Sequence, residues 1–111
     1  AQIHRLLWDD NVGTFLDLDI SGETATRRQY LSAQSLFALY TGVATPEQAG
    51  RIVADVLPLL EQPGGIVGST LESRGPIDPK TRPLRQWDYP FGWAPHQMIA
   101  WYGLLRYGYA E

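Results

Sequence analysis

The residues best suited to chemistry are concentrated in one short stretch, 85–97. Within these positions the sequence places two tryptophans, one tyrosine, one aspartate, two glutamines, two prolines and one glycine. Loops rarely carry this many large aromatic side chains unless something binds there. The stretch therefore predicts a ligand-binding loop that leads into a helix.

The residue types in this loop favour a sugar as the ligand. Sugars present apolar C–H faces, which suit indole rings, and polar edges, which suit carboxylates and amides. Trp87 and Trp93 are candidates for the walls of a sugar subsite, and Gln86 and Asp88 for ligands of its hydroxyls. A structural alternative remains open: the two rings fill a core, and Asp88 caps the positive end of the following helix.

The loop also resembles a known signature. Its motif, Gln86-Trp87-Asp88-x-Pro90-x-Gly92-Trp93-Ala94-Pro95, is similar to the second signature of the trehalases, which are family 37 glycoside hydrolases. Other passages resemble the fungal neutral branch of that family, in the same order. They are Leu7–Asp10, Gly13–Asp17, Ser35–Gly42, Glu72–Ile77 and Arg82–Pro83. The resemblance thus covers almost the whole chain.

The resemblance implies a fold and an activity. It implies a mainly α fold, a segment of an (α/α)6 barrel with alternating inner and outer helices and one short β excursion. Residues 1–111 would form part of a single catalytic domain, because the family barrel has twelve helices and the pattern here offers about four. The implied activity is hydrolysis of α,α-trehalose to two glucose molecules with inversion, without a cofactor, in the cytoplasm.

The resemblance places no catalytic residue on this chain. Inverting glycosidases need an acid and a base about 6.5–9.5 Å apart, with a water between base and substrate. In the family, the Asp acid lies upstream of the matched segment and the Glu base lies downstream. The implied site residues are therefore substrate-binding ones, Gln86, Trp87, Asp88 and Trp93. We expect the 111 residues alone to be inactive, with the rest of the catalytic domain as their partner.

Three other interpretations stay open. The chain could be a stand-alone carbohydrate-binding or interaction module without hydrolase activity. It could belong to a glycosidase with the same barrel and another substrate. It could also be a small helical domain that dimerises through apolar helices.

Composition argues against several other classes of function. The net charge is −3 with acids and bases well mixed, so nothing favours nucleic acid or an anionic membrane. Apolar runs stay well short of the ~20 residues that span a bilayer. The sequence has no cysteine and only His4 and His96, far apart, so a zinc site is not expected.

Hydrophobic spacing predicts three main helices. They should cover 33–41, 46–61 and 96–107, of which the first and last are apolar nearly all round and the middle one is amphipathic. Thr45 and Gln48 form a capping-box pattern, and Pro58 should kink or end the middle helix. We also expect a short helix over residues 3–7, a strand-like piece over 14–20, a loop over 21–30, an extended piece over 66–71 and a long loop over 72–89.

Overall fold

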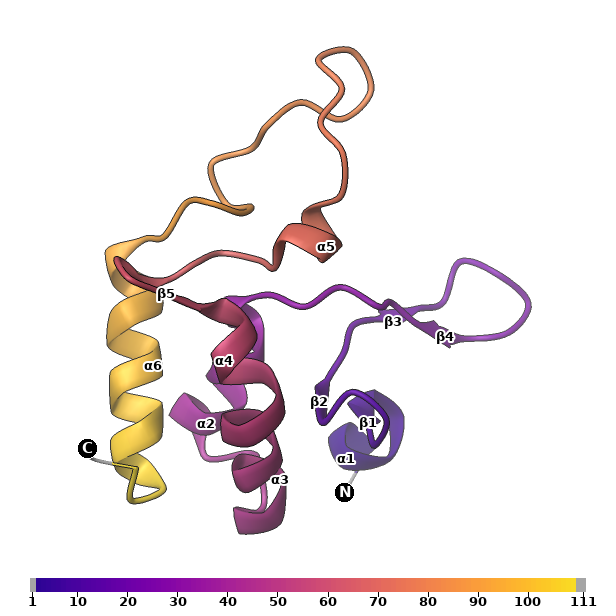
Figure 1. Ribbon diagram of the computed structural model, residues 1–111. Helices are drawn as coiled ribbons and strands as arrows, with labels where there is room; N and C mark the ends of the chain where they lie inside the picture. The colour runs from indigo at the N-terminus through magenta and orange to yellow at the C-terminus, as the bar shows by residue number, and fades with distance from the viewer. Residues whose placement is uncertain (1, 110–111) are drawn as a thin grey trace.

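Three short hairpins interrupt a mainly helical chain (Figure 1). The computed structural model describes residues 2–109. Its helical segments are α1 (Gln2–Leu7), η1 (Ala33–Leu36), α2 (Phe37–Thr41), α3 (Pro46–Arg51), η2 (Ile52–Val56), α4 (Leu57–Leu60), α5 (Leu71–Arg74) and α6 (Ala94–Arg106). The paired strands are β1 (Trp8–Asp9) with β2 (Thr14–Phe15), β3 (Leu18–Asp19) with β4 (Thr26–Arg27), and β5 (Glu61–Gln62) with β6 (Gly65–Ile66).

The predicted helix 46–61 forms as α3, η2 and α4 in succession. Thr45 accepts a hydrogen bond from the Gln48 N–H, and the Gln48 side chain accepts one from the Thr45 N–H, which confirms the capping box. The η2 segment is a π-helix, and the N–H of Leu57 reaches back to the Ile52 carbonyl. Pro58 follows at once and cannot donate a hydrogen bond, so the wider turn accommodates it within the helix.

The predicted helix 33–41 also forms, but its first half is tighter than expected. The Ser32 side chain accepts from the Gln34 N–H and caps η1, a 3₁₀ turn that continues into α2. Gly42 ends α2 with φ of 74°, a left-handed conformation that only glycine adopts without strain.

The predicted strand-like piece over 14–20 is divided between two hairpins. Thr14 and Phe15 pair with Asp9 and Trp8, whereas β3 pairs with β4 inside the region expected to be a loop. The sequence missed β4 because this strand consists of two polar residues, Thr26 and Arg27, with no buried face, in a hairpin that projects from the molecule (Figure 1). The β5–β6 hairpin was likewise not predicted.

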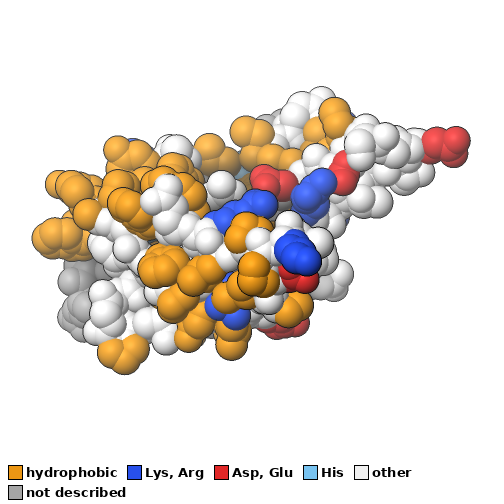
Figure 2. All heavy atoms as spheres, turned by 90° about the horizontal axis from the view of Figure 1, so that it is seen from above, with side chains coloured by type: hydrophobic (Ala, Val, Ile, Leu, Met, Phe, Trp, Pro, Cys, Tyr) orange, Lys and Arg blue, Asp and Glu red, His pale blue; other side chains and the backbone are white. Residues whose placement is uncertain are grey.

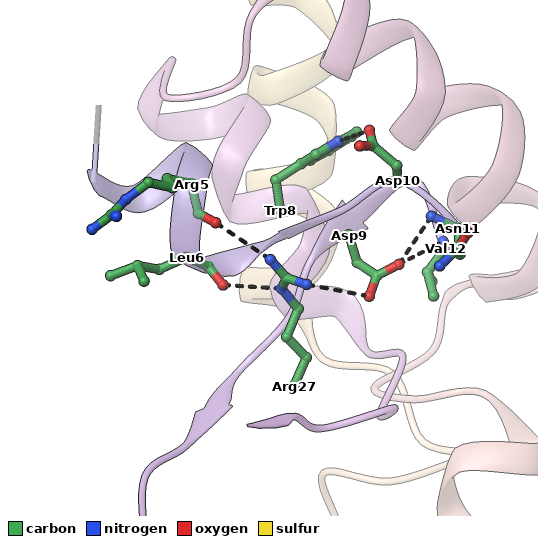
Figure 3. A network of polar contacts seen from close by, with 8 residues as sticks. All are labelled: Arg5, Leu6, Trp8, Asp9, Asp10, Asn11, Val12 and Arg27. Atoms are coloured by element: carbon green, nitrogen blue, oxygen red, sulfur yellow. Dashed lines mark hydrogen bonds and ion pairs between the residues drawn. The ribbon is translucent and has the colours of Figure 1, made fainter. Parts of the chain in front are cut away.

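Arg27 fastens the projecting hairpin to the amino-terminal elements (Figure 3). Its guanidinium donates to the carbonyls of Leu6 and Arg5, at 2.9 and 3.3 Å, and lies 4.0 Å from the Asp9 carboxylate. Asp9 is buried and accepts two backbone N–H groups of the β1–β2 turn. One side chain thus joins α1, β1 and β4.

The core lies where η1, α2, η2, α4 and α6 meet. Its largest fully buried apolar side chains are those of Leu36, Leu39, Ile52, Val56 and Leu60. Helices α2 and α6 run close together because Gly103 of α6 faces Leu39 without a side chain of its own: an added Cβ would lie 2.8 Å from the Leu39 Cβ.

Large apolar side chains remain exposed on the other sides of α2 and α6. The exposed members are Phe37, Tyr40, Met98, Trp101, Tyr102 and Leu105. Seen from above, hydrophobic side chains cover much of the molecule (Figure 2). The predicted apolar character of these helices is thus present, but in this chain only one side of each is buried. Within residues 2–109, no helix has the length and apolarity needed to cross a membrane.

Two glycines inside helices should respond oppositely to alanine. Gly103→Ala forces the Cβ against Leu39 and the Tyr40 backbone, so we expect a loss of about 1–3 kcal/mol in the free energy of unfolding. Gly50→Ala meets only the Tyr109 hydroxyl at 3.6 Å, so we expect a gain of up to about 1 kcal/mol. Denaturant unfolding of the two variants of the intact protein tests this. Equal effects would contradict the close approach of α2 and α6.

Candidate functional site

The aromatic loop, residues 85–97, packs directly against the 66–69 segment. The N–H of Gly68 donates to the Phe91 carbonyl at 2.7 Å, and the N–H of Tyr89 donates to the Ser69 hydroxyl at 2.9 Å. A Cβ on Gly68 would lie 2.0 Å from the Trp87 carbonyl oxygen. Only glycine therefore permits the two backbones to approach this closely.

Gln97 secures the other end of the loop. Its Oε1 accepts from the Ile66 N–H at 2.7 Å, and its Nε2 donates to the Ile66 carbonyl at 2.6 Å. Gly92 faces the same carbonyl, and an added Cβ would lie 2.5 Å from that oxygen. The first turn of α6 is thereby tied to β6, with the loop between them.

Trp87 and Trp93 form a stacked pair. Their ring centroids are 4.8 Å apart, and the ring planes differ by 30°. The Trp93 Nε1 donates to the Gln86 carbonyl at 2.6 Å, and Trp87 meets the His96 ring edge-on at 6.0 Å. Trp87 is 52% exposed and Trp93 37% exposed, so in this chain the rings do not fill a core.

Asp88 accepts a hydrogen bond from the Tyr30 hydroxyl at 2.5 Å. The alternative role of Asp88 as a helix cap is not seen, because Trp93 occupies the N-cap of α6 and no side chain caps that end. Burial, and then the Asp88 carboxylate, raise the pKa of Tyr30, which favours the neutral phenol as the donor.

A cleft of about 300 Å³ opens beside these residues. Two of the four predicted site residues, Trp87 and Asp88, line it, whereas Gln86 and Trp93 are not part of its lining. His96, from the end of the same 85–97 stretch, also lines the cleft, and the rest of the lining comes from segments far away in sequence: Asp17, Tyr30, Ser32, Ala33, Gln34 and Gly68. Sequence reasoning missed the polar members of this set because no motif connects them to the loop.

His96 completes the cleft from the first turn of α6. Its Nδ1 is buried and has no hydrogen-bond partner within residues 2–109. Burial lowers the pKa of the imidazole, because the charged form loses hydration there. The ring is therefore neutral at neutral pH and packs against the edge of Trp87.

Nothing in the described part of the chain gathers metal ligands. Across residues 2–109 no group of three or more His, Cys, Asp or Glu side chains lies together. The chemistry that this arrangement offers is recognition of a small polar molecule: an exposed indole face, a carboxylate with a fixed orientation, and hydroxyl and amide groups around one cleft.

Comparison with known proteins agrees across sequence and structure. The family model described as Trehalase matches residues 1–111. The chain is 50% identical to the cytosolic neutral trehalase of Saccharomyces cerevisiae over 97% of its own length, and 47% identical to that of Kluyveromyces lactis, also over 97%. It spans 14% of the length of each of these relatives.

A solved structure of a trehalase has the same fold as this chain. The neutral trehalase Nth1 from Saccharomyces cerevisiae superposes with a TM-score of 0.90 and 50% sequence identity, over 98% of this chain and 19% of that one. The likeness confirms the predicted fold class, a mainly helical segment of the (α/α)6 type.

The low pKa of His96 predicts how stability depends on pH. Unfolding returns the ring to its ordinary pKa of 6.5, so the unfolded state takes up the proton first as pH falls. The stabilising contribution is complete above pH 6.5 and declines as the pH drops through 6.5 towards the folded pKa. The melting temperature should be measured at several pH values. We expect that of the His96→Asn variant to fall less steeply with decreasing pH than that of the parent protein. The same slope in the variant and the parent would contradict it.

Proposed function

The chain belongs to the trehalase family, and from that premise we propose that the protein carrying it hydrolyses α,α-trehalose to two glucose molecules with inversion. The observation that best supports the proposal is the signature loop, which stacks Trp87 on Trp93 and directs Asp88 to a cleft. A flat apolar face next to a carboxylate is the combination that a pyranose ring requires.

We assign roles in substrate binding to the four signature residues. Trp87 supplies the indole face for the C–H side of a glucose ring, and Asp88 accepts its hydroxyls, since both line the cleft. Trp93 and Gln86 support this subsite, because Trp93 stacks on Trp87 and its own ring is held by the hydrogen bond from its Nε1 to the Gln86 carbonyl.

The catalytic acid and base lie outside these 111 residues in this proposal. The acid protonates the glycosidic oxygen, the base removes a proton from a water, and that water attacks the opposite face of the sugar. The chain spans 14% of its trehalase relatives, which leaves ample length for both groups. Residues 1–111 would then be one part of a single (α/α)6 catalytic domain, and the exposed faces of α2 and α6 would contact the rest of it.

Two further features follow from the same proposal. Two carboxyl groups and a water suffice for the reaction, so no cofactor is required. The relatives named cytosolic neutral trehalases favour a cytosolic location for this protein as well.

The intact protein should release two glucose molecules from each trehalose. Asp88→Asn should lower kcat/KM about 10–100-fold, since it removes a charged hydrogen-bond acceptor for a sugar hydroxyl. Trp87→Ala should cost more than Trp87→Phe, which keeps an aromatic face. Glu61→Gln serves as the control, because this exposed carboxylate of β5 does not line the cleft.

The outcomes separate the candidate functions. Trehalose binding without glucose release would favour the stand-alone carbohydrate-binding module. Hydrolysis of another disaccharide in preference to trehalose would favour a glycosidase of the same fold with a different substrate.

Proton NMR of the first products tests inversion. Both glucosyl units of trehalose are α-linked, so water attack with inversion converts one unit to β-glucose and releases the other as α-glucose. We therefore expect equal amounts of the two anomers before mutarotation. Two α-glucose molecules per trehalose would indicate retention instead.

A further inference from the structure

Tyr30 and Asp88 meet across the cleft from distant parts of the chain. They are 58 positions apart, and the Tyr30 hydroxyl donates to Asp88 Oδ1 at 2.5 Å. Both side chains belong to the lining of the cleft. No other side-chain hydrogen bond within residues 2–109 joins the 28–34 segment to the aromatic loop.

The backbone that carries Tyr30 is itself fixed. The N–H of the next residue, Leu31, donates to the Ser73 hydroxyl at 2.8 Å, and the Leu31 carbonyl accepts from the Thr70 N–H at 3.1 Å. On the other side, the Tyr30 N–H donates to the Arg28 carbonyl at 2.9 Å. The phenol therefore approaches Asp88 from an anchored segment.

Asp88 depends on this contact because it lies in a turn. The Phe91 N–H donates to the Asp88 carbonyl, which fixes the backbone but leaves the carboxylate free to rotate. The Tyr30 hydroxyl is its only hydrogen-bond partner within residues 2–109, and it engages Oδ1. With Oδ1 engaged, Oδ2 remains available to a ligand in the cleft.

We propose that Tyr30 is a positioning residue that holds the Asp88 carboxylate in the orientation that accepts a sugar hydroxyl. The inference rests on the proposed function, because it gives Asp88 a sugar to bind. A pre-oriented carboxylate loses less conformational entropy when the substrate binds, so the contribution of Tyr30 appears as affinity. Burial and Asp88 both raise the pKa of Tyr30, so the phenol keeps its proton at neutral pH.

Tyr30→Phe in the intact protein is the direct test. The variant keeps the ring and removes the hydroxyl, so we expect KM for trehalose to rise about ten-fold while kcat changes less than two-fold. Partial unfolding would act differently, because it lowers the active fraction and so reduces kcat without raising KM. An unchanged KM would overturn the proposal.

Tyr107→Phe is the matched control. Tyr107 also donates its hydroxyl to an oxygen within the chain, the Ala44 carbonyl at 2.6 Å, but it lies outside the cleft lining. We expect both variants to lose similar thermal stability and only Tyr30→Phe to change KM. A comparable rise in KM for Tyr107→Phe would show a general structural effect and overturn the positioning role.

A double-mutant cycle asks whether Tyr30 acts through Asp88. In an Asp88→Asn background, adding Tyr30→Phe should raise KM no further, because the carboxylate that Tyr30 orients is gone. Fully additive effects would overturn the proposal. A wild type that releases no glucose from trehalose would overturn the proposed function, whereas an active wild type with an unaffected Tyr30→Phe variant would overturn only the role of Tyr30.

Tyrosinate absorbance checks the contact without an activity assay. Asp88 helps to raise the pKa of Tyr30, so Asp88→Asn should let one tyrosine ionise at a lower pH than in the wild type. The same shift should be absent when Asp88→Asn is combined with Tyr30→Phe. An identical titration of wild type and Asp88→Asn would overturn the contact.

Discussion

The close approach of two backbone segments, 66–69 and 87–92, is the constraint on which the site depends. Gly68 and Gly92 have no side chains to separate the segments, and hydrogen bonds from Gly68 and Tyr89 join them. The Gln97 side chain then accepts from the Ile66 N–H through Oε1 and donates to the Ile66 carbonyl through Nε2. These short contacts fix the loop without burying its aromatic rings, so the rings stay available to a ligand.

The two ends of the chain's long loop are held by different contacts. One end joins α5, where the Thr70 hydroxyl caps the helix by accepting from the Ser73 N–H, and the Ser73 hydroxyl accepts from the distant Leu31 N–H. The other end exposes the stacked Trp87 and Trp93 at the cleft. Exposed rings of this size gain little from folding alone, since their apolar area stays in water. This exposure supports the proposed role of the two rings in substrate binding.

Local features were predictable because the residues that cause them are neighbours. The capping box at Thr45 and the disturbance at Pro58 each depend on residues within about one helical turn. The β4 strand was missed for a physical reason as well. It is polar and exposed, and Arg27 holds it through contacts with α1 and β1, which no apolar period in the sequence reveals.

The sequence by itself determined the family, the helical fold class and the composition of the candidate loop, because motifs and apolar spacing are read along the chain. Tertiary structure alone decided what surrounds Asp88. The Tyr30 hydroxyl and the Gly68 approach come from contacts between segments far apart in sequence. Such contacts depend on how the chain folds back on itself, and no local propensity specifies the partner that a side chain will meet.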